Sequence, residues 1–252
     1  MDPEPYSSAF IHIPKTAGSF LKNVYFKDKM YCMNSRHRQS RSRSQVIADL
    51  EHMHGLDLPF EFEDWEFDAY LDHPAYLQNN CIKFSVVRNP FDMLVSLWKH
   101  KWPSPRQEWC QRIYDTKYSE FSKFLIDFFS YENIFAPQKN TPLRHNLFFQ
   151  IFNSSGDCTC DFIIKYENLF DEGLEQIKEI SQVSEFHSWK TISKAQYNIT
   201  QDKCRWQNYY TKDLINLVSK NCKFELESFG YKFDNSYKDF VINTEAIKYQ
   251  RV

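Results

Sequence analysis

Short apolar runs and helical apolar stripes alternate along the chain. Residues 10–13, 81–87 and 161–166 are runs rich in β-branched and aromatic side chains, which is typical of buried strands. Residues 91–100 carry apolar side chains at positions 91, 94, 95 and 98 instead, the spacing of one helical face. Further helices are predicted at residues 119–129, 169–180 and 211–229. Strands that alternate with helices indicate an α/β fold, with a central parallel sheet flanked by helices.

A single domain is the simplest organisation of these elements. The chain has 252 residues, enough for one large domain or two small ones. Its sequence shows neither an internal repeat nor a linker composition. The polar, basic stretch 34–44 lacks periodicity, which is typical of a solvated surface loop. We therefore interpret residues 1–252 as one domain.

Charge and composition argue against several classes of protein. The 31 basic and 33 acidic residues nearly balance, which does not favour a general nucleic-acid-binding protein. No apolar run approaches the ~20 residues that cross a bilayer, and the first residues do not resemble a signal peptide. We therefore predict a cytoplasmic protein without a membrane partner. Of the seven cysteines only Cys158 and Cys160 lie close together, so reduced structural thiols are favoured over a metal site.

The first strand is followed by a loop that suits an anion. Pro14 ends the apolar run, Lys15 comes next, and small residues lead into a helical stretch at 20–25. Such a loop directs backbone N–H groups and a positive helix end at one point, which suits a phosphate or sulfate group. It lacks the Walker pattern, because no glycine precedes Gly18, and it also lacks the dinucleotide-binding fingerprint. The alternative is an ordinary turn with a surface lysine.

A second polar loop follows the strand at 81–87. In a parallel α/β sheet ligands bind at the carboxyl ends of the strands, so this loop is expected to lie beside the first. Arg88 can hold a phosphate through its bidentate fork, although a structural ion pair is the alternative for this residue. Ser96 follows eight residues later, about two helical turns into the next helix.

Two segments indicate a family when they are taken together and in this order. The sequence Ile-His-Ile-Pro-Lys-Thr-Ala-Gly-Ser-Phe occupies positions 11–20, and Phe-Ser-Val-Val-Arg-Asn-Pro-Phe-Asp-Met-Leu-Val-Ser-Leu-Trp occupies positions 84–98. Both resemble the carbohydrate-type sulfotransferases, most closely the branch with heparan-sulfate 2-O-sulfotransferase and small bacterial enzymes. Residues 164–169 and 209–231 resemble two further segments of that family. The resemblance implies a P-loop-like sulfotransferase fold and transfer of a sulfuryl group from 3′-phosphoadenosine 5′-phosphosulfate (PAPS) to a hydroxyl or, in some members, an amine.

The resemblance also implies which residues hold the donor. The 5′-phosphosulfate is assigned to Pro14, Lys15, Thr16, Ala17, Gly18, Ser19 and Phe20. Lys15 is expected to touch the oxygens of the leaving phosphate, and Arg88 and Ser96 to hold the 3′-phosphate. Lys194 falls where the family often has a basic residue that helps with the 3′-phosphate, and an exposed lysine is the alternative. The product is adenosine 3′,5′-bisphosphate (PAP), and no metal is implied.

A histidine is expected to act as the general base, because its pKa lies near working pH. His52 and His54 follow a short strand-like piece, and in an extended segment residues two apart point the same way. A His-x-His pair at a similar position supplies the base in the 2-O-sulfotransferase branch. The family often has Gly-His at this place, whereas this chain has Glu51 before His52, so the choice between His54 and His52 stays open. His145 is the alternative, and His12, inside the first strand, is expected to be packed.

The acceptor is expected to be a small molecule or a glycan-like compound, because balanced charge does not suit a long polyanion. The acidic and aromatic residues at 61–68 would suit a cationic acceptor, although a solvated edge with buried rings is the alternative. Two other functions stay open from the sequence. One is a P-loop-like small-molecule kinase that binds ATP, and the other is a non-catalytic nucleotide-binding module of the same fold.

Overall fold

The computed structural model contains one parallel sheet in the part of the chain that it describes. The described residues are 8–21, 31–32, 82–101, 108–130, 147–148, 151–152, 157–181, 204–234 and 242–247. The strands are β1 (Ser8–Ile11), β2 (Tyr31–Cys32), β3 (Ile82–Val87) and β4 (Phe162–Lys165), in the order β2-β1-β3-β4. The predicted α/β fold is therefore confirmed. The short edge strand β2 was not predicted, because two residues carry no period that could be read.

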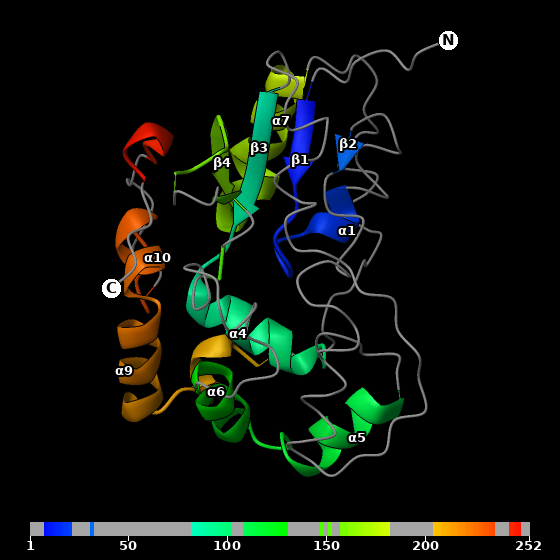
Figure 1. The fold of residues 1–252 in the computed structure, drawn as a ribbon, viewed down its shortest axis with the longest axis vertical. Helices are drawn as coiled ribbons and strands as arrows, with labels where there is room; N and C mark the ends of the chain where they lie inside the picture. Colours follow the sequence, from blue (N-terminus) through cyan, green and yellow to red (C-terminus); the bar gives the residue numbers. More distant parts are fainter. Residues whose placement is uncertain are drawn as a thin grey trace.

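The register of the sheet brings the ends of β1 and β3 together. Phe10 pairs with Phe84 and Ile11 with Ser85, and all pairs run parallel. The Ser85 hydroxyl also donates a hydrogen bond of 2.7 Å to the Ile11 carbonyl oxygen. Figure 1 shows β1 and β3 side by side, with their arrowheads toward α1 and α4. The loops that follow these two strands consequently leave the sheet at the same edge.

Seven α-helices lie in the described segments. They are α1 (Gly18–Phe20), α4 (Pro90–Lys99), α5 (Glu108–Thr116), α6 (Phe121–Phe129), α7 (Leu174–Ser181), α9 (Lys212–Asn221) and α10 (Lys223–Ser228). Proline at the first position favours the start of α4, and the Asn89 side chain caps it by accepting from the Phe91 amide. None of these helices is long and apolar enough to cross a bilayer.

The structure corrects three predicted boundaries. The single helix expected at 211–229 is two helices, because the chain turns at Cys222 between α9 and α10. The helix expected at 169–180 begins as a π-helical turn, Leu169–Gly173, before α7. Pairing of the first strand ends at Ile11, two residues before the predicted end, because the chain already turns toward the loop.

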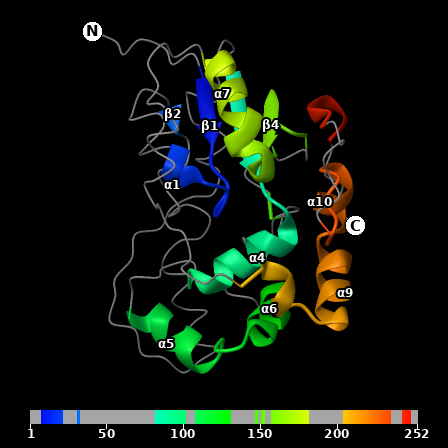
Figure 2. The same ribbon diagram turned by 180° about the vertical axis from the view of Figure 1, so that it is seen from behind.

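Two apolar clusters cover the two faces of the sheet. On one face Val87 packs with the apolar sides of α4, α6 and α9. On the other face Phe84 and Val86 pack with Leu21 and with Leu174 of α7. Figure 2, seen from behind, shows α7 lying across this second face. A parallel sheet needs cover on both faces, and the cover leaves the carboxyl edge of β1 and β3 as the place for a site.

Candidate functional site

The loop after β1 is held by a buried side chain and adopts a strained backbone. Thr16 is fully buried, and its hydroxyl donates a hydrogen bond of 2.8 Å to the Ile13 carbonyl oxygen. Lys15 and Ala17 both have φ of 66°, in the left-handed region. Such a conformation costs on the order of 1–3 kcal/mol for a residue other than glycine. Strain of this kind is typical of ligand-binding loops, where the surrounding contacts maintain it.

Gly18 is required by a close contact and not by its backbone angle. A Cβ atom at this position would lie 2.0 Å from both Cδ2 and Nε2 of the His12 ring. His12 itself is buried, with 7% of its surface exposed, and its ring lies tilted against that of Phe10, at 5.8 Å between ring centroids. The prediction that His12 is packed is confirmed. The His12 ring packs against the backbone of Gly18, and any side chain at position 18 would overlap this ring.

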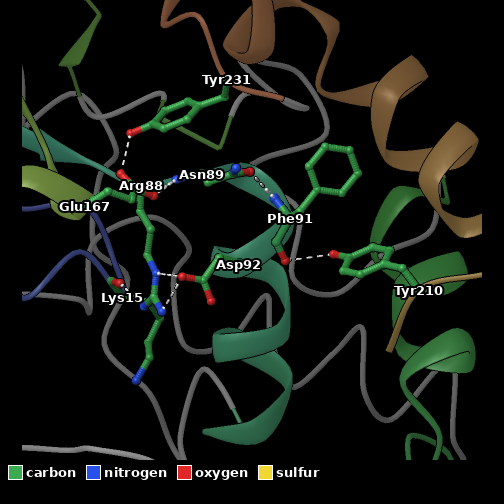
Figure 3. Close-up of polar contacts among 8 residues, drawn as sticks. All are labelled: Lys15, Arg88, Asn89, Phe91, Asp92, Glu167, Tyr210 and Tyr231. Carbon is green, nitrogen blue, oxygen red and sulfur yellow. Dashed lines mark hydrogen bonds and ion pairs between the residues drawn. The ribbon is translucent and has the colours of Figure 1, made fainter. Parts of the chain in front are cut away.

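The loop after β3 contacts the first loop through Arg88. All three guanidinium nitrogens are engaged: Nε and Nη2 contact Asp92 Oδ2 at 2.9 and 2.8 Å, and Nη1 donates to the Lys15 carbonyl oxygen at 2.9 Å. The guanidinium carbon also lies 4.4 Å from the centroid of the Tyr166 ring. Figure 3 shows the contacts of Arg88 with Asp92 and with Lys15. The predicted convergence of the two loops is confirmed, and the structural ion pair foreseen for Arg88 is present.

A second network ties two distant segments to the start of α4. Glu167 accepts hydrogen bonds from the Asn89 amide at 2.7 Å and from the Tyr231 hydroxyl at 3.0 Å. The Asn89 side-chain amide donates to the Lys232 carbonyl oxygen at 2.9 Å. Gly230, with φ of 63°, ends α10 and turns the chain back toward this point. Burial raises the pKa of Glu167 above its ordinary value, although these donors oppose the shift.

The two positive side chains at this edge make it suitable for an anion. Burial, and then the Arg88 charge, lower the pKa of Lys15 from 10.5 to about 8. Among the described residues no acceptor is paired with the Lys15 ammonium. Figure 3 shows the Lys15 side chain extending past the Arg88 guanidinium. An anion bound here would relieve the repulsion between the two cations.

Sequence reasoning did not foresee a role for Lys165 and Glu167. Lys165 ends β4 opposite Val87, is buried, and lies 5.0 Å from the Tyr231 ring centroid. Burial lowers its pKa to about 8, and the Glu167 carboxylate opposes this shift. The only sequence signal was that residues 164–169 and 209–231 resemble segments of one family. Resemblance alone did not indicate that the two segments touch.

The remaining predicted residues are distributed as follows. Pro14 and Phe20 are buried, and the Phe20 ring packs 5.2 Å from that of Phe170. Ser96 is half-buried on α4. The backbone of Ser19 lies in α1. Outside the described residues lie His52, His54, His145, Lys194 and the stretch 61–68.

The close cysteine pair, Cys158 and Cys160, was the one candidate for a metal site in the sequence. Cys158 and Cys160 are both free thiols. In the described segments no group of three or more His, Cys, Asp or Glu side chains could hold a metal ion.

The fold and the site together define a class, the α/β proteins with a positively charged site at the carboxyl edge of a parallel sheet. A family model described as the sulfotransferase family matches residues 3–232. The chain therefore belongs to the sulfotransferase family, and the predicted enzyme class, a PAPS-dependent sulfotransferase, is confirmed. The match does not specify the carbohydrate-type branch.

Two further comparisons give little detail. Among solved structures, the chain is similar to mouse sulfotransferase SULT7A1 complexed with PAP, with 14% identity and a TM-score of 0.35. This similarity covers 88% of the present chain and 85% of the mouse chain. A search of curated proteins finds no match.

Proposed function

We propose that this protein transfers the sulfuryl group of PAPS to a hydroxyl, or an amine, of a small-molecule or glycan-like acceptor, as an enzyme of the carbohydrate-type branch. The observation that carries the proposal is the Lys15 ammonium. It lies at the shared carboxyl edge of β1 and β3, next to Arg88, and no described acid neutralises it. The phosphates of the donor supply the negative charge that this arrangement lacks.

The first loop would hold the 5′-phosphosulfate, and Arg88, Ser96 and Lys194 the 3′-phosphate. By analogy with phosphoryl transfer, the acceptor oxygen attacks sulfur in line while the bond from sulfur to the bridging oxygen breaks. Negative charge then grows on the leaving phosphate. Lys15 and the loop N–H groups would stabilise this charge, and removal of one such donor typically lowers the rate by about 10²–10³. The sulfuryl group carries less charge than a phosphoryl group, so the proposal needs no metal.

The general base of the proposal is His54 or His52. It takes the acceptor proton as the new bond to sulfur forms. We expect His54→Ala or His52→Ala to abolish most turnover while PAP binding is retained. Retained turnover in both variants, with loss in His145→Ala, would assign the base to His145 instead.

Acceptor chemistry and cellular setting belong to the same proposal. Residues 61–68 would recognise a cationic acceptor, and a strong salt dependence of the acceptor KM is the expected sign. The reaction is proposed to take place in the cytoplasm, on one domain formed by residues 1–252. Cell fractionation tests the location, and limited proteolysis tests the single domain.

Titration calorimetry with PAP and with ATP tests the donor. We expect PAP to bind at about micromolar concentration without magnesium, and Lys15→Met to weaken it, because the variant loses the one ammonium in the loop. The matched control is Lys123→Met, which removes an exposed lysine on α6 that pairs with Glu120. Preferential binding of ATP with magnesium would favour the kinase alternative. Binding of PAP without turnover of any acceptor would favour the non-catalytic module.

A further inference from the structure

Asp92 is not part of the proposed donor site, yet it contacts the residue that connects both loops. It lies in the first turn of α4, one turn after Arg88, and accepts from two guanidinium nitrogens through a single oxygen, Oδ2. The side chains of Arg88 and Asp92 are only 14% and 19% exposed, so water screens this pair weakly. The Tyr166 ring lies against one face of the same guanidinium. The Asp92 carboxylate and the Tyr166 ring together hold the Arg88 guanidinium in one orientation.

This orientation aims the remaining nitrogen at the first loop. Nη1 of Arg88 donates to the carbonyl oxygen of Lys15, the residue that adopts the left-handed backbone conformation. A hydrogen bond from a charged donor is stronger than a neutral one and can hold a backbone conformation that is unfavourable alone. The contacts therefore run from Asp92 through Arg88 to the backbone of the Lys15 loop. Both terminal nitrogens keep a second N–H that could meet a phosphate.

We propose that Asp92 is a positioning residue that acts through Arg88: it fixes the guanidinium so that Nη1 holds the Lys15 loop in its left-handed conformation. This inference rests on the proposed function, because it joins the sites for the two phosphate groups of the donor. Loss of Asp92 then loosens the 5′ site as well as the 3′ site. If Asp92 acted only through its charge, its loss would strengthen donor binding, because a carboxylate next to an anion site repels the anion.

The test compares two ligands that differ only in the 3′-phosphate. PAP and adenosine 5′-monophosphate are titrated into wild-type protein and into Asp92→Asn, which keeps the shape of the side chain and removes its charge. We expect the variant to bind both ligands about tenfold or more weakly, the size of one lost charge-assisted hydrogen bond. The control is Asp115→Asn, which removes an exposed carboxylate on α5 that pairs with Lys101. Thermal melting of each variant verifies that it is folded.

Hydrogen exchange provides a readout that needs no ligand. In the ligand-free Asp92→Asn protein we expect faster amide exchange at Thr16 and Ala17, and no change in the amides of α9. If Asp92→Asn does not fold, Arg88→Lys serves in its place, because an ammonium keeps the charge but cannot make both contacts.

Three results would overturn the inference. One is weaker binding of PAP with unchanged binding of the monophosphate, which would make Arg88 a local clamp for the 3′-phosphate. Another is tighter binding of PAP by the variant, which would mean that Asp92 affects the donor only through electrostatic repulsion. The third is unchanged exchange at the loop. Absence of PAP binding by the wild-type protein would instead reject the proposed function, and the exchange result would still decide whether Asp92 holds the loop.

Discussion

Lys15 combines two unfavourable features in one residue. Its backbone has a left-handed φ of 66°, and its ammonium is partly buried beside Arg88, which lowers its pKa to about 8. The unfolded chain, with the ordinary lysine pKa of 10.5, binds more protons than the folded chain between these two values. In this window Lys15 therefore makes the free energy of unfolding rise with pH. A residue that opposes folding at neutral pH is understandable where a bound anion is to be held.

The same pKa predicts the pH dependence of donor binding. PAP affinity of the wild-type protein is expected to fall as pH rises through about 8, because Lys15 loses its charge while the phosphates are already ionised. In Lys15→Arg the charge persists, since a guanidinium does not titrate in this range, so affinity should stay level. Calorimetry on either side of this pH measures both proteins. An equal decline in wild type and variant would assign the titration to another group.

At the scale of the elements, the turn from β1 into α1 depends on two neighbouring residues with opposite requirements. Ala17 adopts a left-handed backbone that glycine would tolerate better, whereas Gly18 faces the His12 ring. The low glycine content of the chain makes this placement informative. The structure explains the glycine at position 18 by its close approach to the His12 ring and not by a left-handed backbone.

Exchanging the two side chains in turn tests this description. Gly18→Ala is expected to lower the free energy of unfolding by about 1–3 kcal/mol, because the added methyl overlaps the His12 ring. Ala17→Gly should raise the free energy of unfolding slightly, because relief of about 1–2 kcal/mol of left-handed strain exceeds about 0.5–1 kcal/mol of added chain entropy. Urea denaturation measures both variants. Equal stability of Gly18→Ala and wild type would show that the His12 ring can move to another rotamer without cost.

At the scale of the whole molecule, residues far apart in sequence meet at the start of α4. The chain leaves α10 at Gly230, and the next two residues contact Glu167 and Asn89. Figure 1 shows α9 and α10 following one another along one side of the molecule. The return of the chain from α10 is therefore what brings Tyr231 and Lys232 to the loop that carries Arg88.

Removal of one hydroxyl tests the importance of this return. Tyr231→Phe removes the hydroxyl that donates to the half-buried Glu167, which should cost about 1–3 kcal/mol of stability and raise the carboxyl pKa further. The matched control is Lys232→Ala. Its exposed side chain is removed while the backbone carbonyl that receives the Asn89 bond stays, so the change should remain within about 0.5 kcal/mol. Thermal melting compares the two variants. Equal melting temperatures for Tyr231→Phe and Lys232→Ala would show that the Tyr231 hydroxyl does not stabilise this network.

Local patterns predicted the parts of the fold that depend on local forces. The strands at 81–87 and 161–166 and the helix at 91–100 were predicted within one residue at each end, because their apolar periods are strong. The break at Cys222 was missed, since the apolar pattern continues across it. Lys165 and Glu167 were missed for a different reason. A charged residue in a sequence does not reveal whether it is buried, or by what.

The sequence by itself determined the class of fold, the family and the two loops that carry positive charge, because a strand end, a proline and a lysine are local features. Only the tertiary structure decided how these parts cooperate. It placed Arg88 on the Lys15 carbonyl and on Asp92, and it placed His12 under Gly18. The contact between Arg88 and the Lys15 carbonyl depends on the parallel pairing of β1 with β3, which joins residues more than seventy positions apart. Such pairing follows from packing of the whole chain, and no short segment contains it.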